Sequence, residues 1–182
     1  PLGLSLPAAA GDTPAAARAR LAAFDVAALV STLADAGFST VELNTDLELF
    51  LPGCYDEAAL DRLATLQERR GLAYTVPLPL WSIEPSTPDP RVRQASLAAL
   101  ADSLYRLSRL EPAVFVLHAT GVLAAEFGRL GLPPLAKALV TDVFRDRARA
   151  SLAALLAQTG VAPRRLALEN VEFPFEATLA LA

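Results

Sequence analysis

The chain has 182 residues, of which 53% are hydrophobic and 20% are charged, so it can build a hydrophobic core and is not intrinsically disordered. Its 16 Lys and Arg residues against 20 Asp and Glu residues leave a net charge of −4, which argues against long nucleic acid as a partner. A single cysteine excludes a disulfide within the chain. With no apolar run of about 18 residues and no signal-peptide layout, we expect a cytoplasmic protein with no membrane partner.

Short apolar runs alternate with longer helical patterns along the chain. The apolar runs predict five strands, over residues 2–6, 40–44, 73–78, 113–117 and 165–168. Apolar residues at helical spacing predict a helical stretch through residues 21–33 and helices over 57–70, 91–110, 122–130 and 135–158, with a last helix from about residue 175. Asp56 is a suitable N-cap, and Gly37, Gly71 and Gly160 are suitable helix stops.

The connections between the predicted strands are long, and none is a two-residue hairpin turn. Strands connected in this way are parallel, with right-handed helical crossovers, so the fold class is α/β. The strand spacing slightly exceeds the roughly 31 residues of one unit in a (β/α)8 TIM barrel. We therefore predict a single domain over residues 1–182 that covers about five βα units of such a barrel. A complete, doubly wound five-stranded sheet is the alternative.

Two further observations favour a C-terminally truncated fragment over a complete sheet. The sequence contains no methionine, so Pro1 is not a natural start, and the last predicted helix is cut at Ala182. A barrel that stops after five units cannot close, which leaves its edge strands unpaired. We therefore expect the isolated chain to be inactive and to associate, for example as a homo-oligomer.

In a parallel α/β protein, function lies at the carboxyl ends of the strands. The candidates there are Glu42 and Asn44 after the second predicted strand, Trp81 after the third, His118 after the fourth, and Glu169 and Asn170 after the fifth. No glycine-rich phosphate motif follows the first strand, which argues against a dinucleotide or P-loop nucleotide.

His118 and Glu169 are the strongest of these candidates. His118 is the only histidine of the chain, and an imidazole at a strand end binds a divalent metal or transfers a proton. A carboxylate that ends a buried strand, as Glu169 does, is costly unless it is paired or bound to a cation. A hydrogen-bonded rim histidine and an ion pair between Glu169 and an arginine are the structural alternatives.

The other four residues are candidate substrate contacts. Strand alternation places Glu42 on the barrel interior and Asn44 on the same face nearer the rim, with an internal salt bridge as the alternative for Glu42. Trp81, together with neighbouring prolines, would form one wall of a pocket, or it would only pack its loop. Asn170 points to the opposite face from Glu169 and either contacts substrate or caps the next helix.

Three of these strand ends resemble one known group of barrels. The segments VELN (41–44), VFVLHATG (114–121) and LALEN (166–170) are similar to the xylose-isomerase-like TIM barrels, also called the AP endonuclease family 2 superfamily of sugar-phosphate isomerases and epimerases. The segment from AYTVPLPLW (73–81) to VFVLHATG is also similar to cobamide-remodelling phosphodiesterases of that superfamily.

The resemblance implies a role for three residues. Glu169 matches a metal ligand that also serves acid–base chemistry, His118 matches a metal ligand or substrate contact, and Glu42 matches a pocket residue. Many members have a histidine on the third strand, where this chain has Pro77, so an endonuclease-type site with two or three metals is in doubt. The remaining ligands of the family come from strands six to eight.

Three functions stay open on the sequence alone. The first is a sugar or sugar-phosphate isomerase or epimerase that uses a divalent metal (Mn²⁺, Mg²⁺, Co²⁺ or Zn²⁺) and acts on a small-molecule substrate. The second is a metal-dependent phosphodiesterase acting on a small phosphodiester such as a cobamide nucleotide loop. The third is a barrel without catalytic activity, which the proline at position 77 favours.

Overall fold

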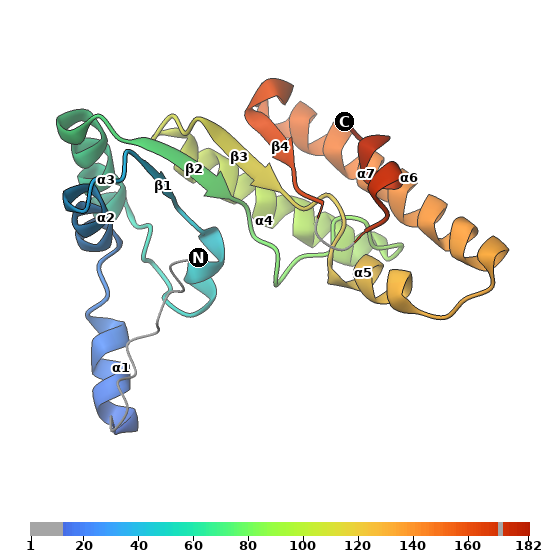
Figure 1. Ribbon diagram of the computed structural model, residues 1–182, viewed down its shortest axis with the longest axis horizontal. Helices are drawn as coiled ribbons and strands as arrows, with labels where there is room; N and C mark the ends of the chain where they lie inside the picture. The colour runs from blue at the N-terminus through green and yellow to red at the C-terminus, as the bar shows by residue number, and fades with distance from the viewer. Residues whose placement is uncertain (1–12, 171–172) are drawn as a thin grey trace. The chain divides into compact units, whose positions relative to one another are not determined.

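The computed structural model describes residues 13–170 and 173–182 (Figure 1). The strand predicted over 2–6 lies outside the described residues. The chain divides into two compact units, one formed by residues up to 39 with residues 47–72, the other by residues 40–46 with residues 73–182. The expectation of a single domain stays a prediction.

The first unit is helical. It contains α1 (Pro14–Ala22), α2 (Val26–Asp35) and α3 (Glu57–Arg70), and the 3-10 helix η1 (Thr45–Leu49) lies in the connection that enters it. The helical stretch predicted through residues 21–33 is two helices, because the Asp25 side chain accepts hydrogen bonds from the N–H groups of Ala27 and Ala28 and begins α2. Arg62 of α3 lies 3.0 Å from the same carboxylate and ties the two helices together.

The second unit contains a parallel sheet. Its strands, in spatial order, are β1 (Thr40–Glu42), β2 (Ala73–Pro77), β3 (Val114–Leu117) and β4 (Leu166–Leu168). Every neighbouring pair is parallel, which confirms the α/β fold class and four of the five predicted strands. β4 starts at Leu166 because residues Pro163–Arg165 form a 3-10 turn, η2.

Helices connect these strands. They are α4 (Pro90–Ser108), α5 (Val122–Arg129), α6 (Pro134–Thr159) and, after β4, α7 (Phe175–Leu179). The predicted bounds hold to within two residues, because local signals set them. Asp89 caps α4 by accepting the Arg91 N–H, and Gly160, at φ 67°, ends α6 in the left-handed conformation.

The two faces of the sheet differ in burial. Side chains on one face are buried, namely Val41, Tyr74, Val76, Phe115 and Leu117, and α4 lies behind β2 and β3 in Figure 1. Side chains on the other face are half-buried or exposed, namely Glu42, Thr75, Pro77, Val116 and Ala167. This open face is the one predicted to line the barrel interior, and Glu42 lies on it as expected.

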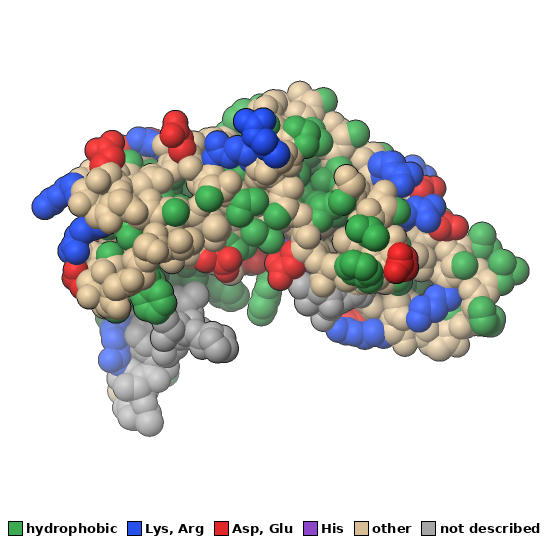
Figure 2. Space-filling view, turned by 45° about the horizontal axis from the view of Figure 1, so that its top comes forward, with side chains coloured by type: hydrophobic (Ala, Val, Ile, Leu, Met, Phe, Trp, Pro, Cys, Tyr) green, Lys and Arg blue, Asp and Glu red, His purple; other side chains and the backbone are tan. Residues whose placement is uncertain are grey.

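The surface carries charges of both signs. Figure 2 shows Lys and Arg side chains interspersed with Asp and Glu on the visible face, without one large patch of either sign. Among the helices described, none combines the length and apolarity that crossing a membrane requires.

Candidate functional site

His118 and Glu169 meet at the carboxyl ends of β3 and β4. Leu117 and Leu168 are register partners in these strands, so the next residue of each strand lies at the same level. The Glu169 N–H donates to the Leu117 carbonyl at 3.0 Å, which extends the ladder to the site. His118 Nε2 lies 3.2 Å from Glu169 Oε2. The parallel register therefore brings together the two strongest candidates of the sequence.

The pair differs in exposure. The His118 side chain is 13% exposed, whereas the Glu169 side chain is 49% exposed. The sequence argument expected a buried carboxylate with arginine as its structural partner. The open face of the sheet leaves Glu169 accessible instead, and the side chain 3.2 Å from its carboxylate is the imidazole of His118. The carboxylate is therefore open to solvent, while the imidazole is mostly buried.

A small cleft lies beside the pair. Its volume is about 140 Å³, and it is lined by Leu80, His118, Thr120, Gly121, Val122, Ala125 and Glu169. These residues come from the loop after β2, from the segment between β3 and the start of α5, and from the end of β4. The cleft therefore lies at the carboxyl ends of neighbouring parallel strands, and the prediction that it is a functional site stays a prediction.

A further carboxylate, Glu84, adjoins this cleft from the loop between β2 and α4. Its Oε1 accepts the N–H of Leu123 at 2.9 Å, and its Oε2 is buried without a hydrogen-bond partner among the described residues. Burial raises the pKa of Glu84, and hydrogen bonds from the Leu123 and Val122 N–H groups partly oppose this rise. Sequence reasoning passed over Glu84 because its partner lies 39 residues away.

The polar residues that follow β1 have structural partners. Asn44 Oδ1 accepts the Asp46 N–H at 2.8 Å, and the Thr45 hydroxyl donates to the Pro77 carbonyl at 2.7 Å. The Asp46 carboxylate accepts the Leu80 N–H at 3.1 Å and so fixes the loop after β2, which supplies one wall of the cleft. The sequence analysis missed Asp46, whose only sequence signal is its place just after a strand.

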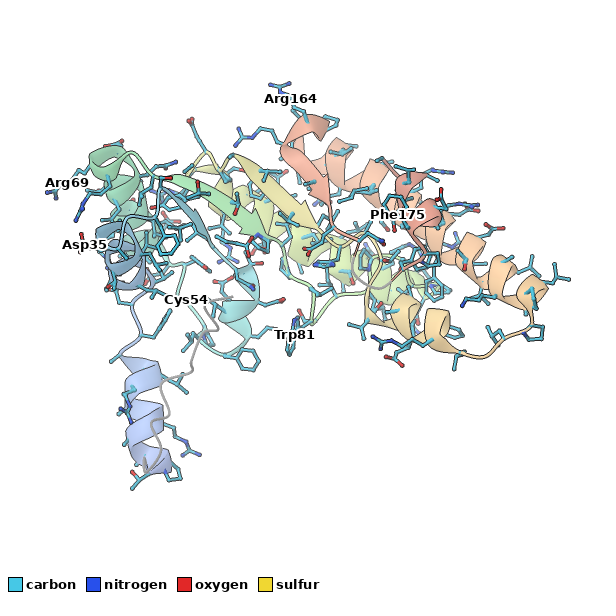
Figure 3. The ribbon with its side chains drawn as sticks, in the orientation of Figure 1. Asp35, Cys54, Arg69, Trp81, Arg164 and Phe175 are labelled. Atoms are coloured by element: carbon cyan, nitrogen blue, oxygen red, sulfur yellow. The ribbon has the colours of Figure 1, made fainter. Side chains whose placement is uncertain are left out.

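Three predicted substrate contacts are not among the residues that line the cleft. Glu42 is exposed on β1, which two further strands separate from β4. Trp81 is 72% exposed and projects from its loop (Figure 3), and Leu80 lines the cleft in its place. Asn170 accepts a hydrogen bond from the Thr178 hydroxyl of α7 at 2.8 Å, which is a structural role of the kind considered from the sequence.

The imidazole nitrogen of His118 and the carboxylate oxygens of Glu169 are atoms of the kind that bind divalent metals. Imidazole nitrogen together with carboxylate oxygen is a ligand combination used by Mn²⁺, Co²⁺ and Zn²⁺. Among the described residues, no group of three or more His, Cys, Asp or Glu side chains is placed to hold a metal ion. His118 and Glu169 therefore fit as part of a ligand set.

Comparison with known proteins supports the fold. The chain is similar to a D-tagatose 3-epimerase-like protein, at 18% identity with a TM-score of 0.59, over 83% of this chain and 51% of that one. It is also similar to a D-psicose 3-epimerase solved in the presence of D-fructose, at 14% identity with a TM-score of 0.59, over 87% of this chain and 53% of that one.

Comparison by sequence identifies no similar protein. No protein-family model and no curated protein matches the chain. The chain spans about half the length of the two epimerase structures, which is consistent with part of a (β/α)8 barrel. The similarity confirms the fold class, and at these identities it establishes the fold alone.

Proposed function

We propose that the chain carries part of the active site of a metal-dependent sugar epimerase or isomerase, with His118 and Glu169 as ligands of a divalent cation. The observation that supports this most directly is the placement of an imidazole and an accessible carboxylate, 3.2 Å apart, beside one cleft at the ends of neighbouring parallel strands. The fold shared with two sugar 3-epimerases supports the choice of reaction.

The ligand types narrow the choice of metal. Mg²⁺ strongly prefers oxygen ligands, whereas Mn²⁺, Co²⁺ and Zn²⁺ also accept imidazole nitrogen. Of the four metals considered from the sequence, His118 therefore favours the last three. When bound, the cation would polarise the carbonyl and hydroxyl oxygens of the sugar. The further ligands would come from water or from residues outside those described.

Glu169 is the group on this chain best placed to move a proton. Its half-exposed carboxylate accepts the proton from the carbon next to the sugar carbonyl, while the electron pair of the broken C–H bond moves towards the carbonyl oxygen. Return of a proton to the same carbon from the opposite face gives the epimer, and return to the neighbouring carbon gives the isomer. His118, mostly buried, would bind the same cation through its imidazole nitrogen.

The cleft favours a neutral sugar over a sugar phosphate. No Lys or Arg is among its described lining residues, whereas phosphate recognition depends on cations or free backbone N–H groups. At the start of α5, whose N–H groups would otherwise suit a phosphate, the Leu123 N–H donates to Glu84, and this carboxylate lies beside Gly121. The same features give no support to the phosphodiesterase alternative.

The experiment measures cation binding and proton exchange separately. Mn²⁺ is titrated into the chain by calorimetry, with His118→Ala and Glu169→Gln as variants and Glu126→Gln, on the exposed part of α5, as the matched carboxylate control. In parallel, because the isolated chain is expected to be inactive, D-fructose is incubated with the full-length protein in D₂O, with and without EDTA, and deuterium at C3 is followed by NMR.

The two readouts decide between the functions. We expect Mn²⁺ binding that both site variants abolish and the control retains, together with deuterium incorporation that EDTA stops. Binding that Glu169→Gln leaves unchanged, with no incorporation under any condition, would establish the non-catalytic barrel instead.

A further inference from the structure

The start of α5 is capped by a carboxylate from a distant loop. Gly121 is the N-cap residue of α5 and has no side chain with which to satisfy the first N–H groups of the helix. Glu84 supplies an acceptor for one of these groups, because its Oε1 accepts the N–H of Leu123 at 2.9 Å. The order of α5 at its first turn therefore depends on the loop that follows β2.

Glu84 and Gly121 are fitted to each other. A Cβ at position 121 would lie 2.2 Å from Glu84 Oε2 and 2.6 Å from its Cδ. The backbone of Gly121, at φ −87° and ψ −172°, is one that any residue adopts. Glycine is therefore needed here for the close approach of the carboxylate and for no reason of backbone conformation.

The loop that carries Glu84 is itself held from two helices. The Glu84 N–H donates to Ser96 Oγ at 2.8 Å, and Ser96 is a buried residue of α4 whose hydroxyl also bonds to the Val92 carbonyl. From α6, the buried Ser151 hydroxyl donates to the Pro85 carbonyl at 2.6 Å. The backbone that carries the Glu84 carboxylate is thus held in place by α4 and α6.

Only two residues, Ala119 and Thr120, separate His118 from the capped N-terminus of α5. Thr120, Gly121 and Val122 also line the cleft. We propose that Glu84 is a positioning residue, which fixes the start of α5 and through it the segment 118–121, so that the His118 ring lies against Glu169 beside the cleft. The inference rests on the proposed function only for what His118 does once it is positioned.

The single histidine of the chain allows a test that needs neither metal nor substrate. The ring nitrogens and protons of His118 give one set of imidazole NMR signals, which report its surroundings directly. We expect Glu84→Ala to shift or broaden these signals and the Gly121 amide signal, and Glu84→Gln, which keeps an acceptor oxygen, to restore them. The matched control is Asp89→Ala, which removes the N-cap carboxylate of α4 from the same loop.

A double-mutant cycle tests the fit between the two residues. Gly121→Ala drives a methyl group into the carboxylate, so we expect it to disturb the His118 signals and to lower Tm by at least the roughly 2–4 °C expected for the loss of a helix cap in a chain of this size. Adding Glu84→Ala removes the nearer obstacle and leaves only the Ile83 carbonyl, 3.0 Å from the new methyl group, so the double variant is expected to melt higher than Gly121→Ala alone. Such non-additivity is the mark of direct contact.

The outcomes separate positioning from mere stability. If Glu84→Ala lowers Tm as Asp89→Ala does while the His118 signals stay at their wild-type positions, the proposal is overturned. Additive effects of the two substitutions in the cycle would also overturn it. If the wild-type chain shows the expected NMR behaviour but binds no Mn²⁺, the positioning role stands and the proposed function fails.

Discussion

The carboxyl ends of β1 and β2 differ from those of β3 and β4, although all four strands are parallel and end on the same side of one sheet. After β1, the polar groups of Asn44, Thr45 and Asp46 bind backbone atoms of the same turn, of the end of β2 or of the loop after it. After β3 and β4, the side chains of His118 and Glu169 lie 3.2 Å apart beside a cleft. Side chains at equivalent strand ends therefore stabilise loops at one end of the sheet and contact each other at the other end.

The position of a residue at a strand end determines which edge of the sheet its side chain reaches, but not which groups the side chain binds there. Parallel strands deliver their last side chains to one edge, but backbone N–H and C=O groups in the following loops compete for them. Asp46 lies in the 3-10 helix η1 and Asn44 directly precedes it, so such groups are within reach of both side chains. His118 and Glu169 lie on the open face of the sheet, where their side chains contact each other.

Removal of the reactive pair is expected to have the largest effect. His118→Ala and Glu169→Gln are each expected to weaken Mn²⁺ binding by more than the roughly 10–100-fold that loss of an outer-shell partner costs, because each removes a direct ligand. Calorimetry measures this, with Glu42→Gln at the other edge as the control. Equal weakening by Glu42→Gln would show that the two ends act as one site.

Asp46→Ala is expected to affect stability and not metal binding. Its part-buried carboxylate accepts N–H groups from the loop after β2, and hydrogen bonds to charged groups contribute about 1.5–3 kcal/mol to the free energy of unfolding. Urea denaturation measures the loss, and Asp46→Asn, which keeps an acceptor, should recover part of it. A variant with unchanged stability would mean that the loop holds without this carboxylate.

The pH dependence of stability sharpens the comparison at Glu84. Because its pKa is raised above the ordinary value of 4.5, the folded chain binds the Glu84 proton more tightly than the unfolded chain does. The contribution of Glu84 to the free energy of unfolding is therefore fully present at pH values below its ordinary pKa of 4.5. It is lost as the pH rises through the higher pKa of the folded chain. Glu84→Gln should flatten the stability profile in that window, and identical profiles would contradict the assignment.

Trp81→Ala is expected to have the smallest effect. Its side chain is 72% exposed, and substitutions at such positions change the free energy of unfolding by about 0.5 kcal/mol or less. Trp81 is also the only tryptophan, so its fluorescence tests the prediction that it contacts substrate. A shift of the emission on addition of D-fructose would establish that contact, and emission unchanged at saturating sugar would remove it.

Much of the second unit could be predicted from sequence because its signals are local. The periods of 2.0 and 3.6 residues and the end signals at Asp89 and Gly160 placed four strands and the connecting helices nearly at their observed bounds. Parallel pairing then implied that His118 and Glu169 would lie at one edge. The prediction that Trp81 contacts substrate rested on loop composition only, which carries no information on the direction of a side chain.

Sequence alone determined the order and type of the elements, and which residues stand at strand ends, since these depend on neighbours a few positions apart. Only the tertiary structure decided that Glu169 is accessible, that Asp46 is engaged by the loop after β2, and that Glu84 caps a helix 39 residues further along. Such contacts depend on the three-dimensional register of distant segments, and no short-range pattern of residues encodes that register.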